Sequence, residues 1–266
     1  LTKALGLPKA SIVMRHVEGS GCYGHNGADD VAFDAVVLAM ALPGDPVRVV
    51  WSRADELSQA PLGSAHLVAL RARLSDQGHI THWHHELWAN GYSSRPGRAV
   101  LPTLLGASQR ANGQPIPLAI NPPLAAGGGS DRNAVPGYQI EHTHVVNHRL
   151  TVMPLRTSAM RALGAFANVF AIESFMDELA HASGQDPVAF RRRHMTDARS
   201  LAVLNAVVER STWWHLPREE GVGHGVAWAR YKNTSAWCAV LARVQAGETL
   251  RVLHLDVAVD VGRVVD

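Results

Sequence analysis

The chain has 266 residues, of which 47% are hydrophobic, and a formal net charge of +2. This length can bury one large core or two modest ones, while the mixed charges provide no basic stripe of the kind that a nucleic-acid-binding protein needs. No apolar run approaches the roughly 18 residues of a membrane-spanning helix, and Cys22 and Cys238 have no neighbouring cysteine, so we expect a soluble globular chain without a cysteine-based metal site.

A glycine-rich segment leads into the first predicted helix. Residues 19–30 carry four glycines and end in two aspartates, either of which can cap a helix over residues 31–42. Residues 46–51 are rich in β-branched residues and predict a buried strand, followed by a turn at 53–56.

The middle of the chain predicts a sheet. Alternating patterns at 66–74 and 79–89 flank a short polar turn and predict a hairpin. Residues 91–137 hold many Gly and Pro residues and predict a long irregular crossing with one short helix. Residues 140–151 alternate again and predict another strand.

The second half predicts helices followed by strands. Residues 165–183 repeat apolar side chains at three- and four-residue steps, which is typical of an amphipathic helix. Asp186 and Pro187 are a capping residue and a first helical residue, and a further helix is predicted near 201–208. Strand-like runs follow at 237–244 and 250–259.

Two glycine clusters could face a ligand. In residues 19–27 the glycines let backbone N–H groups point at an anionic or oxo ligand beside a helix start. The segment lacks the Gly-Lys-Ser/Thr of a nucleotide-binding loop, and a tight turn into the helix is the simpler interpretation. Residues 221–225 are either a second ligand-facing loop or a plain β-turn.

An arginine stands at the entrance to the predicted helix 165–183. Arg161 could donate two parallel hydrogen bonds to an anionic cofactor or polarise a substrate oxygen. The alternative is that Arg161 is an ordinary surface residue, with Glu173 and Asp177 on a solvated helix face.

The histidines permit a metal interpretation, to which we assign no residue. His82 and His84 project from one face of a strand, as do His142 and His144, so each strand could supply two ligands. The zinc-protease HExxH motif is absent, and partly exposed strand histidines are the simpler account.

Six sequence elements, in order, resemble the molybdopterin-binding large subunit of the molybdenum hydroxylases, the xanthine dehydrogenase and aldehyde oxidase family, and most closely its isoquinoline oxidoreductase beta-subunit type. They lie at 21–24, 46–53, 161–164 with Glu173, 177–180, 186–191 and 260–265. The resemblance implies an α+β fold with two mixed sheet-and-helix subdomains, residues 1–150 and 151–266, each a partial molybdopterin-binding subdomain.

The resemblance also implies roles for individual residues. Arg161 would face the substrate or the metal's oxygen ligands as the catalytic contact, and Leu163 would touch the substrate. The cofactor-binding positions would be Gly21, Cys22, Tyr23, Gly24, Gly164 and Ala165.

The implied activity is that of an oxidoreductase that hydroxylates an N-heterocycle or oxidises an aldehyde with water-derived oxygen. Electrons would pass to a partner iron–sulfur subunit or a cytochrome subunit. The family's catalytic glutamate would follow residue 266 and its Gly-Gln element would precede residue 1, so we expect an internal fragment. Two other hypotheses are a non-catalytic binding or assembly module and a histidine-based metal hydrolase.

Overall fold

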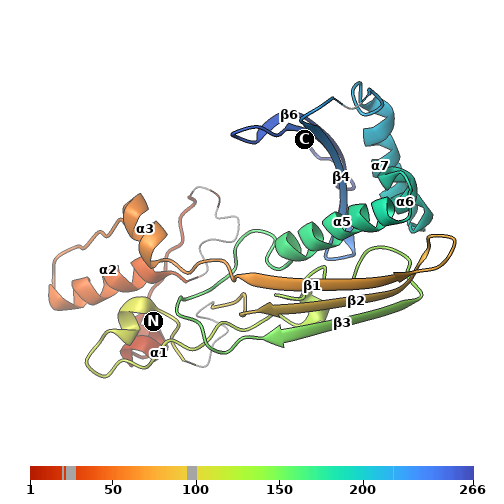
Figure 1. The fold of residues 1–266 in the computed structure, drawn as a ribbon. Helices are drawn as coiled ribbons and strands as arrows, with labels where there is room; N and C mark the ends of the chain where they lie inside the picture. Colours follow the sequence, from red (N-terminus) through yellow and green to blue (C-terminus); the bar gives the residue numbers. More distant parts are fainter. Residues whose placement is uncertain (20, 22–27, 95–100, 218) are drawn as a thin grey trace. The chain divides into compact units, whose positions relative to one another are not determined.

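The computed structural model describes residues 1–19, 21, 28–94, 101–217 and 219–266. It confirms the α+β class, with helices and two three-stranded sheets in the described residues (Figure 1). The chain forms two compact units that interleave in sequence: unit 1 is 1–66, 88–130 and 148–163, and unit 2 is 67–87, 131–147 and 164–266. The division into cofactor-binding subdomains near residue 150 stays a prediction.

Unit 1 contains short helices around a small core. Phe33 packs against Leu104 and Ala107 where the second helix meets the fourth. The predicted helix 31–42 is confirmed within one residue at each end. The helical elements are α1 (Thr2–Leu5), the 3-10 turn η1 (Lys9–Ser11), α2 (Asp30–Ala41), α3 (Arg53–Gln59), α4 (Leu105–Ser108) and the 3-10 turn η2 (Leu124–Ala126).

The aspartates before α2 do not cap it as predicted. Asp29 holds the N-cap position with φ 59°, but its side chain makes no capping hydrogen bond. Asp30 is 4% exposed, and its carboxylate accepts hydrogen bonds from the Arg156 guanidinium at 2.6 and 3.0 Å and from the Leu105 N–H at 2.8 Å. Asp30 therefore ties α2 to α4 and to residue 156.

The strand predicted at 46–51 is wrong. The segment has no strand partner in the described residues, and Val50 is 71% exposed. The turn predicted at 53–56 is instead the start of α3. Ser52 Oγ accepts from the Asp55 N–H at 3.2 Å, and the Asp55 carboxylate accepts from the Ser52 N–H at 2.9 Å. This reciprocal capping box stabilises the helix start.

The first sheet confirms the predicted hairpin and adds the strand predicted at 140–151. Its order is β1 (His66–Leu74), β2 (Ile80–Ala89), β3 (His142–Arg149). Imidazole rings pair between β2 and β3 at a constant offset, His82 with His142 and His84 with His144. A constant offset means that β2 and β3 run parallel, as their arrows in Figure 1 show.

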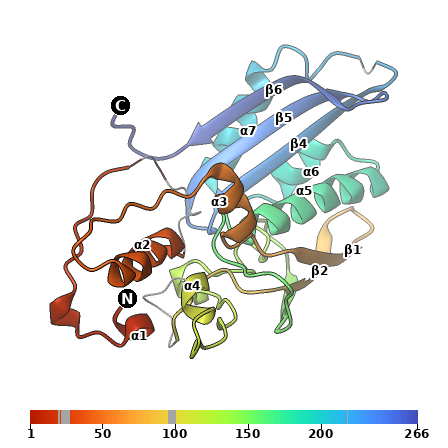
Figure 2. The same cartoon turned by 90° about the vertical axis from the view of Figure 1, so that its left-hand side faces the viewer.

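The rest of unit 2 is three helices and an antiparallel sheet. They are α5 (Ala165–Ala182), α6 (Pro187–Arg193), α7 (Ala198–Arg210), β4 (Val222–Tyr231), β5 (Ser235–Gln245) and β6 (Arg251–Asp260). Helix α5 lies along the first sheet, with Phe175 against Trp83, and α7 covers one face of the second (Figure 2). One apolar core therefore runs through both layers of unit 2.

Most of the second glycine cluster belongs to a strand, and only Gly221 lies in a turn. Gly223 and Gly225 lie inside β4, paired with Val244 and Ala242 of β5. Gly221 precedes the strand with φ 73°. The strand forms because β5 lies beside it and pairs with its backbone hydrogen-bonding groups. The low strand propensity of glycine does not predict such a strand.

The 260–265 element ends the second sheet with a structural ion pair. The Asp260 carboxylate binds the Arg199 guanidinium, with Nε at 2.6 Å, and that guanidinium stacks 3.6 Å from the centre of the Trp237 ring. The hydrogen bond from Arg199 lowers the pKa of Asp260 to about 2. Asp260 thus fastens the end of β6 to α7.

The predicted start of α6 is confirmed. Pro187 is the first helical residue, and the Asp186 carboxylate accepts from the N–H groups of Val188 and Ala189 at 3.0 and 2.8 Å. Asp186→Ala is expected to lower the free energy of unfolding by about 1 kcal/mol because two N–H groups lose their acceptor. Urea denaturation of the two proteins measures this, and Asp186→Asn should retain most of the stability. An equal loss in both variants would contradict a capping role.

Within the part of the chain that the structure describes, no helix is both long and apolar enough to span a bilayer.

Candidate functional site

Two consecutive non-glycine residues adopt the left-handed conformation just before α5. Ala162 has φ 73° and Leu163 has φ 54°, a conformation that costs L-residues roughly 1–2 kcal/mol each. They lie in the turn 161–164, where the Leu163 N–H donates to the Met160 carbonyl at 3.0 Å. Backbone strain of this kind concentrates at ligand-binding sites.

The start of α5 suits a negatively charged ligand. Gly164 is the N-cap residue, and no described side chain caps the helix. The first N–H groups of an α-helix have no intrahelical partner, and the helix dipole adds partial positive charge there. Gly164 and Ala165 are buried and small, so an anionic group could approach these N–H donors closely.

Asn168 anchors the helix start. Its side chain is fully buried; the amide donates to the Arg132 carbonyl at 3.0 Å and pairs with His85 Nε2 of β2 at 3.1 Å. Its backbone N–H bonds the Gly164 carbonyl. The first turn of α5 is therefore fixed to the first sheet and to the segment around residue 132.

That segment belongs to residues 91–137, whose described part is irregular as predicted, apart from the short helical elements α4 and η2 and isolated bridges. Arg132 donates to the Tyr231 hydroxyl at 2.6 Å. Asn133, with φ 61°, bonds the Arg230 carbonyl and the Lys232 N–H. Asparagine tolerates a left-handed φ better than most residues, so Asn133 was the sequence signal for a turn at this position.

The structure describes five of the predicted site residues. Residues 161–165 form one continuous stretch: Arg161 is exposed, Leu163 is half-buried, and Gly164 and Ala165 are buried. Gly21 is exposed, whereas Cys22, Tyr23 and Gly24 lie outside the described residues. Of the predicted site, therefore, only the entrance of α5 has a described geometry that can be compared with the charge and size of a ligand.

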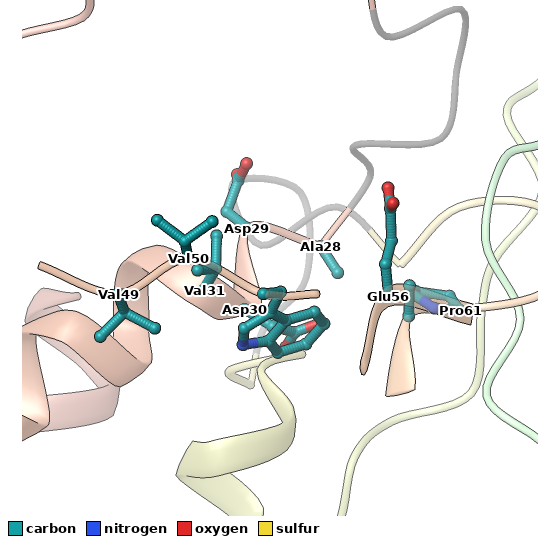
Figure 3. Close-up of a pocket in the computed structure, with 10 residues that line it drawn as sticks. Ala28, Asp29, Asp30, Val31, Val49, Val50, Glu56 and Pro61 are labelled. Atoms are coloured by element: carbon teal, nitrogen blue, oxygen red, sulfur yellow. The ribbon is translucent and has the colours of Figure 1, made fainter. Parts of the chain in front are cut away.

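A cavity of about 390 Å³ lies beside the start of α2. Figure 3 shows Asp29 and Glu56 on opposite sides of it, with their carboxylates pointing the same way. Two carboxylates repel an anionic ligand. Among the described residues the entrance of α5 suits an anionic group, whereas this cavity does not.

Glu173 is a buried structural acid. Its carboxylate accepts hydrogen bonds from the Tyr138 hydroxyl at 2.7 Å, from Arg191 Nε at 2.9 Å and from the Trp228 N–H at 2.9 Å. Burial raises the pKa of Glu173, and the Arg191 guanidinium opposes the shift. The alternative interpretation, in which Glu173 lies on a solvated helix face, is wrong. The Asp177 carboxylate also binds Arg191, at 2.5 Å.

Comparison with known proteins covers this region directly. Residues 130–195, which include β3, the turn 161–164 and α5, match the family model of the molybdopterin cofactor-binding domain. The chain belongs to the molybdenum hydroxylase family. Residues 130–195 are its molybdopterin cofactor-binding domain.

Curated members of the molybdenum hydroxylase family are similar along most of the chain. One of the subunits of nicotinate dehydrogenase from Pseudomonas putida is 34% identical over 90% of this chain and 20% of its own length. The isoquinoline 1-oxidoreductase beta chain of Brevundimonas diminuta is 28% identical over 98% of this chain and 31% of its own length. The chain thus spans between a fifth and a third of these relatives.

A solved structure supports the fold. The aldehyde oxidoreductase of Desulfovibrio gigas superposes with a TM-score of 0.51 and 18% identity, covering 87% of this chain and 25% of the other. The likeness extends to the arrangement of helices and strands alone. The roles of individual residues in this chain rest on its own geometry.

Proposed function

We propose that the chain is the molybdopterin-binding part of an oxidoreductase that hydroxylates an N-heterocycle or oxidises an aldehyde. The oxygen would come from water, and partner iron–sulfur or cytochrome subunits would accept the electrons. The observation that supports this proposal is the strained pair Ala162–Leu163 before the uncapped start of α5, inside the matched cofactor-binding domain.

In this proposal each residue of the entrance has a separate task. The first N–H groups of α5 donate to anionic groups of the cofactor, which the small Gly164 and Ala165 allow to approach. The left-handed turn fixes the direction in which Arg161 and Leu163 leave the backbone. Leu163 offers apolar contact to the substrate, and Arg161 donates hydrogen bonds to an oxygen that gains negative charge.

The glycine loop completes the proposed set, with Gly21, Cys22, Tyr23 and Gly24 holding the pterin through their backbone. When bound, the cofactor supplies the redox centre that takes electrons from the substrate. The chain's own residues bind it, orient the substrate and stabilise developing charge.

The full-length protein allows a direct test. Molybdenum is measured by mass spectrometry, pterin by fluorescence, and turnover with a dye acceptor on N-heterocycles and aldehydes. Arg161→Ala is expected to retain molybdenum and to lower kcat/KM by about a hundredfold, as the loss of one charge-stabilising donor does. Arg210→Ala, at the exposed end of α7, is the matched control and should leave both unchanged.

The possible failures are distinguishable. Absence of molybdenum and pterin from the full-length protein would contradict the proposed function. Cofactor loading without any oxidation of the substrate panel would favour the non-catalytic assembly module. An Arg161→Ala variant as active as the control would reject the role of Arg161 alone.

A further inference from the structure

A second site lies on the first sheet, on the face opposite α5. A recess of about 580 Å³ opens there within unit 2. Two basic side chains from each strand line it, since alternate residues of a strand share a face. This basic recess comprises Arg71 and Arg73 of β1, His82 and His84 of β2, and His142 and His144 of β3.

The histidines meet in cross-strand pairs. The rings of His82 and His142 have centroids 4.6 Å apart, and Nδ1 of His84 lies 3.2 Å from Nδ1 of His144. At that distance one nitrogen donates and the other accepts, so the pair holds one shared proton. In a neutral pair the accepting ring carries its own hydrogen on Nε2, where it can donate to an anion.

The two arginines supply permanent positive charge. Both are exposed, and neither guanidinium forms an ion pair with a carboxylate in the described ranges. Guanidinium groups bind carboxylates and phosphates through two parallel hydrogen bonds. The recess therefore contains anion-binding groups that no described residue of the protein occupies.

Two acidic residues lie at the rim of the recess. Glu86 lies 3.6 Å from His84 Nε2, and Glu141 lies 3.4 Å from His142 Nε2. Each carboxylate faces a histidine, so the two arginine guanidinium groups remain the cationic contacts for an anion.

We propose that the basic recess binds a small polyvalent oxyanion, a phosphate or a carboxylate. Arg71 and Arg73 make the charged contacts, and the histidine pairs add imidazole N–H donors. None of these residues belongs to the entrance of α5. A metal cation is disfavoured by the arginines, and the described residues contain no group of three or more His, Cys, Asp or Glu placed to hold one.

Titration calorimetry of the full-length protein tests the proposal with sulfate and oxalate, whose charge is constant near neutral pH. At constant ionic strength and with EDTA present, at least one of the two anions should bind with a dissociation constant in the millimolar range or below. Tighter sulfate binding would identify a phosphate-like ligand, and tighter oxalate binding a carboxylate.

Paired substitutions separate the two kinds of contact. R71Q with R73Q is expected to abolish binding. H84Q with H144Q should weaken binding without abolishing it, because the two arginine contacts remain. The control for general electrostatics is R251Q with R263Q, which changes two exposed arginines at and beyond β6. This control should leave the affinity unchanged.

Two outcomes would overturn the proposal: no binding at millimolar anion, or a loss of affinity in the control equal to that of R71Q with R73Q. Binding that EDTA removes would also overturn it, because it would show a metal in the recess. Circular dichroism of each variant confirms that it is folded before its affinity is compared.

Discussion

Arg191→Met is expected to lower the free energy of unfolding by about 3–5 kcal/mol, as the loss of one partner from a buried ion pair does. Arg191 is fully buried. Its guanidinium donates to the Glu173 carboxylate and carbonyl, to Asp177 and to the Pro187 carbonyl. Methionine fills the space but leaves Glu173 as a buried charge without its cation.

The pH dependence of this variant has a definite sign. Burial raises the pKa of Glu173 in the folded protein, so protonation favours folding, and this stability is lost as the pH rises through the folded pKa. Without Arg191 that pKa rises further, so the deficit of Arg191→Met should be smaller near pH 5 than near pH 8.

Urea denaturation at both pH values measures the effect. Arg192→Met is the matched control, because the neighbouring Arg192 is exposed and its guanidinium bonds only Asn205 among the described residues. This substitution should change the free energy of unfolding by no more than about 0.5 kcal/mol. Equal losses of unfolding free energy in Arg191→Met and Arg192→Met would show that the ion pair between Glu173 and Arg191 is not the central interaction of unit 2.

Asp30→Ala is expected to cost about 3 kcal/mol, because it leaves the mostly buried Arg156 guanidinium without its anion and the Leu105 N–H without its acceptor. Asp30→Asn should have an intermediate effect, since an amide oxygen can still accept from Leu105. Thermal and urea denaturation measure the order of the three proteins.

Asp29→Asn serves as the control for this position. Asp29 is exposed, makes no capping hydrogen bond, and has a left-handed φ that asparagine also tolerates, so the change should be within about 0.5 kcal/mol. A larger loss of stability from the Asp29 substitution than from Asp30→Ala would show that Asp29 does cap α2.

The sequence predicted those elements whose signals are local. Helix α5, the β1–β2 hairpin and the Asp186–Pro187 start of α6 depend on periodicity and capping within a few residues. The predicted strand at 46–51 failed because a strand also needs a neighbour, which local composition does not report. Strand β4 was missed for the converse reason, since pairing with β5 stabilises it despite the low strand propensity of its glycines.

The candidate site was predicted unevenly. Residues 161–165 were identified through the resemblance, but nothing in alanine or leucine indicates that Ala162 and Leu163 take a left-handed φ. Burial of Glu173 depends on Arg191, which lies on another helix. The histidine pairs require β2 and β3 to be neighbours, and strands 60 residues apart in sequence give no local sign of that.

The parallel pairing of β2 with β3 has a consequence for folding kinetics. The hairpin can form from neighbouring residues within microseconds, but β3 can join only after the chain between Ala89 and His142 has crossed over. Closing such a long connection loses chain entropy before any pairing compensates it. The edge of β2 therefore stays open during folding, and nascent chains are most exposed to mispairing with one another at this strand.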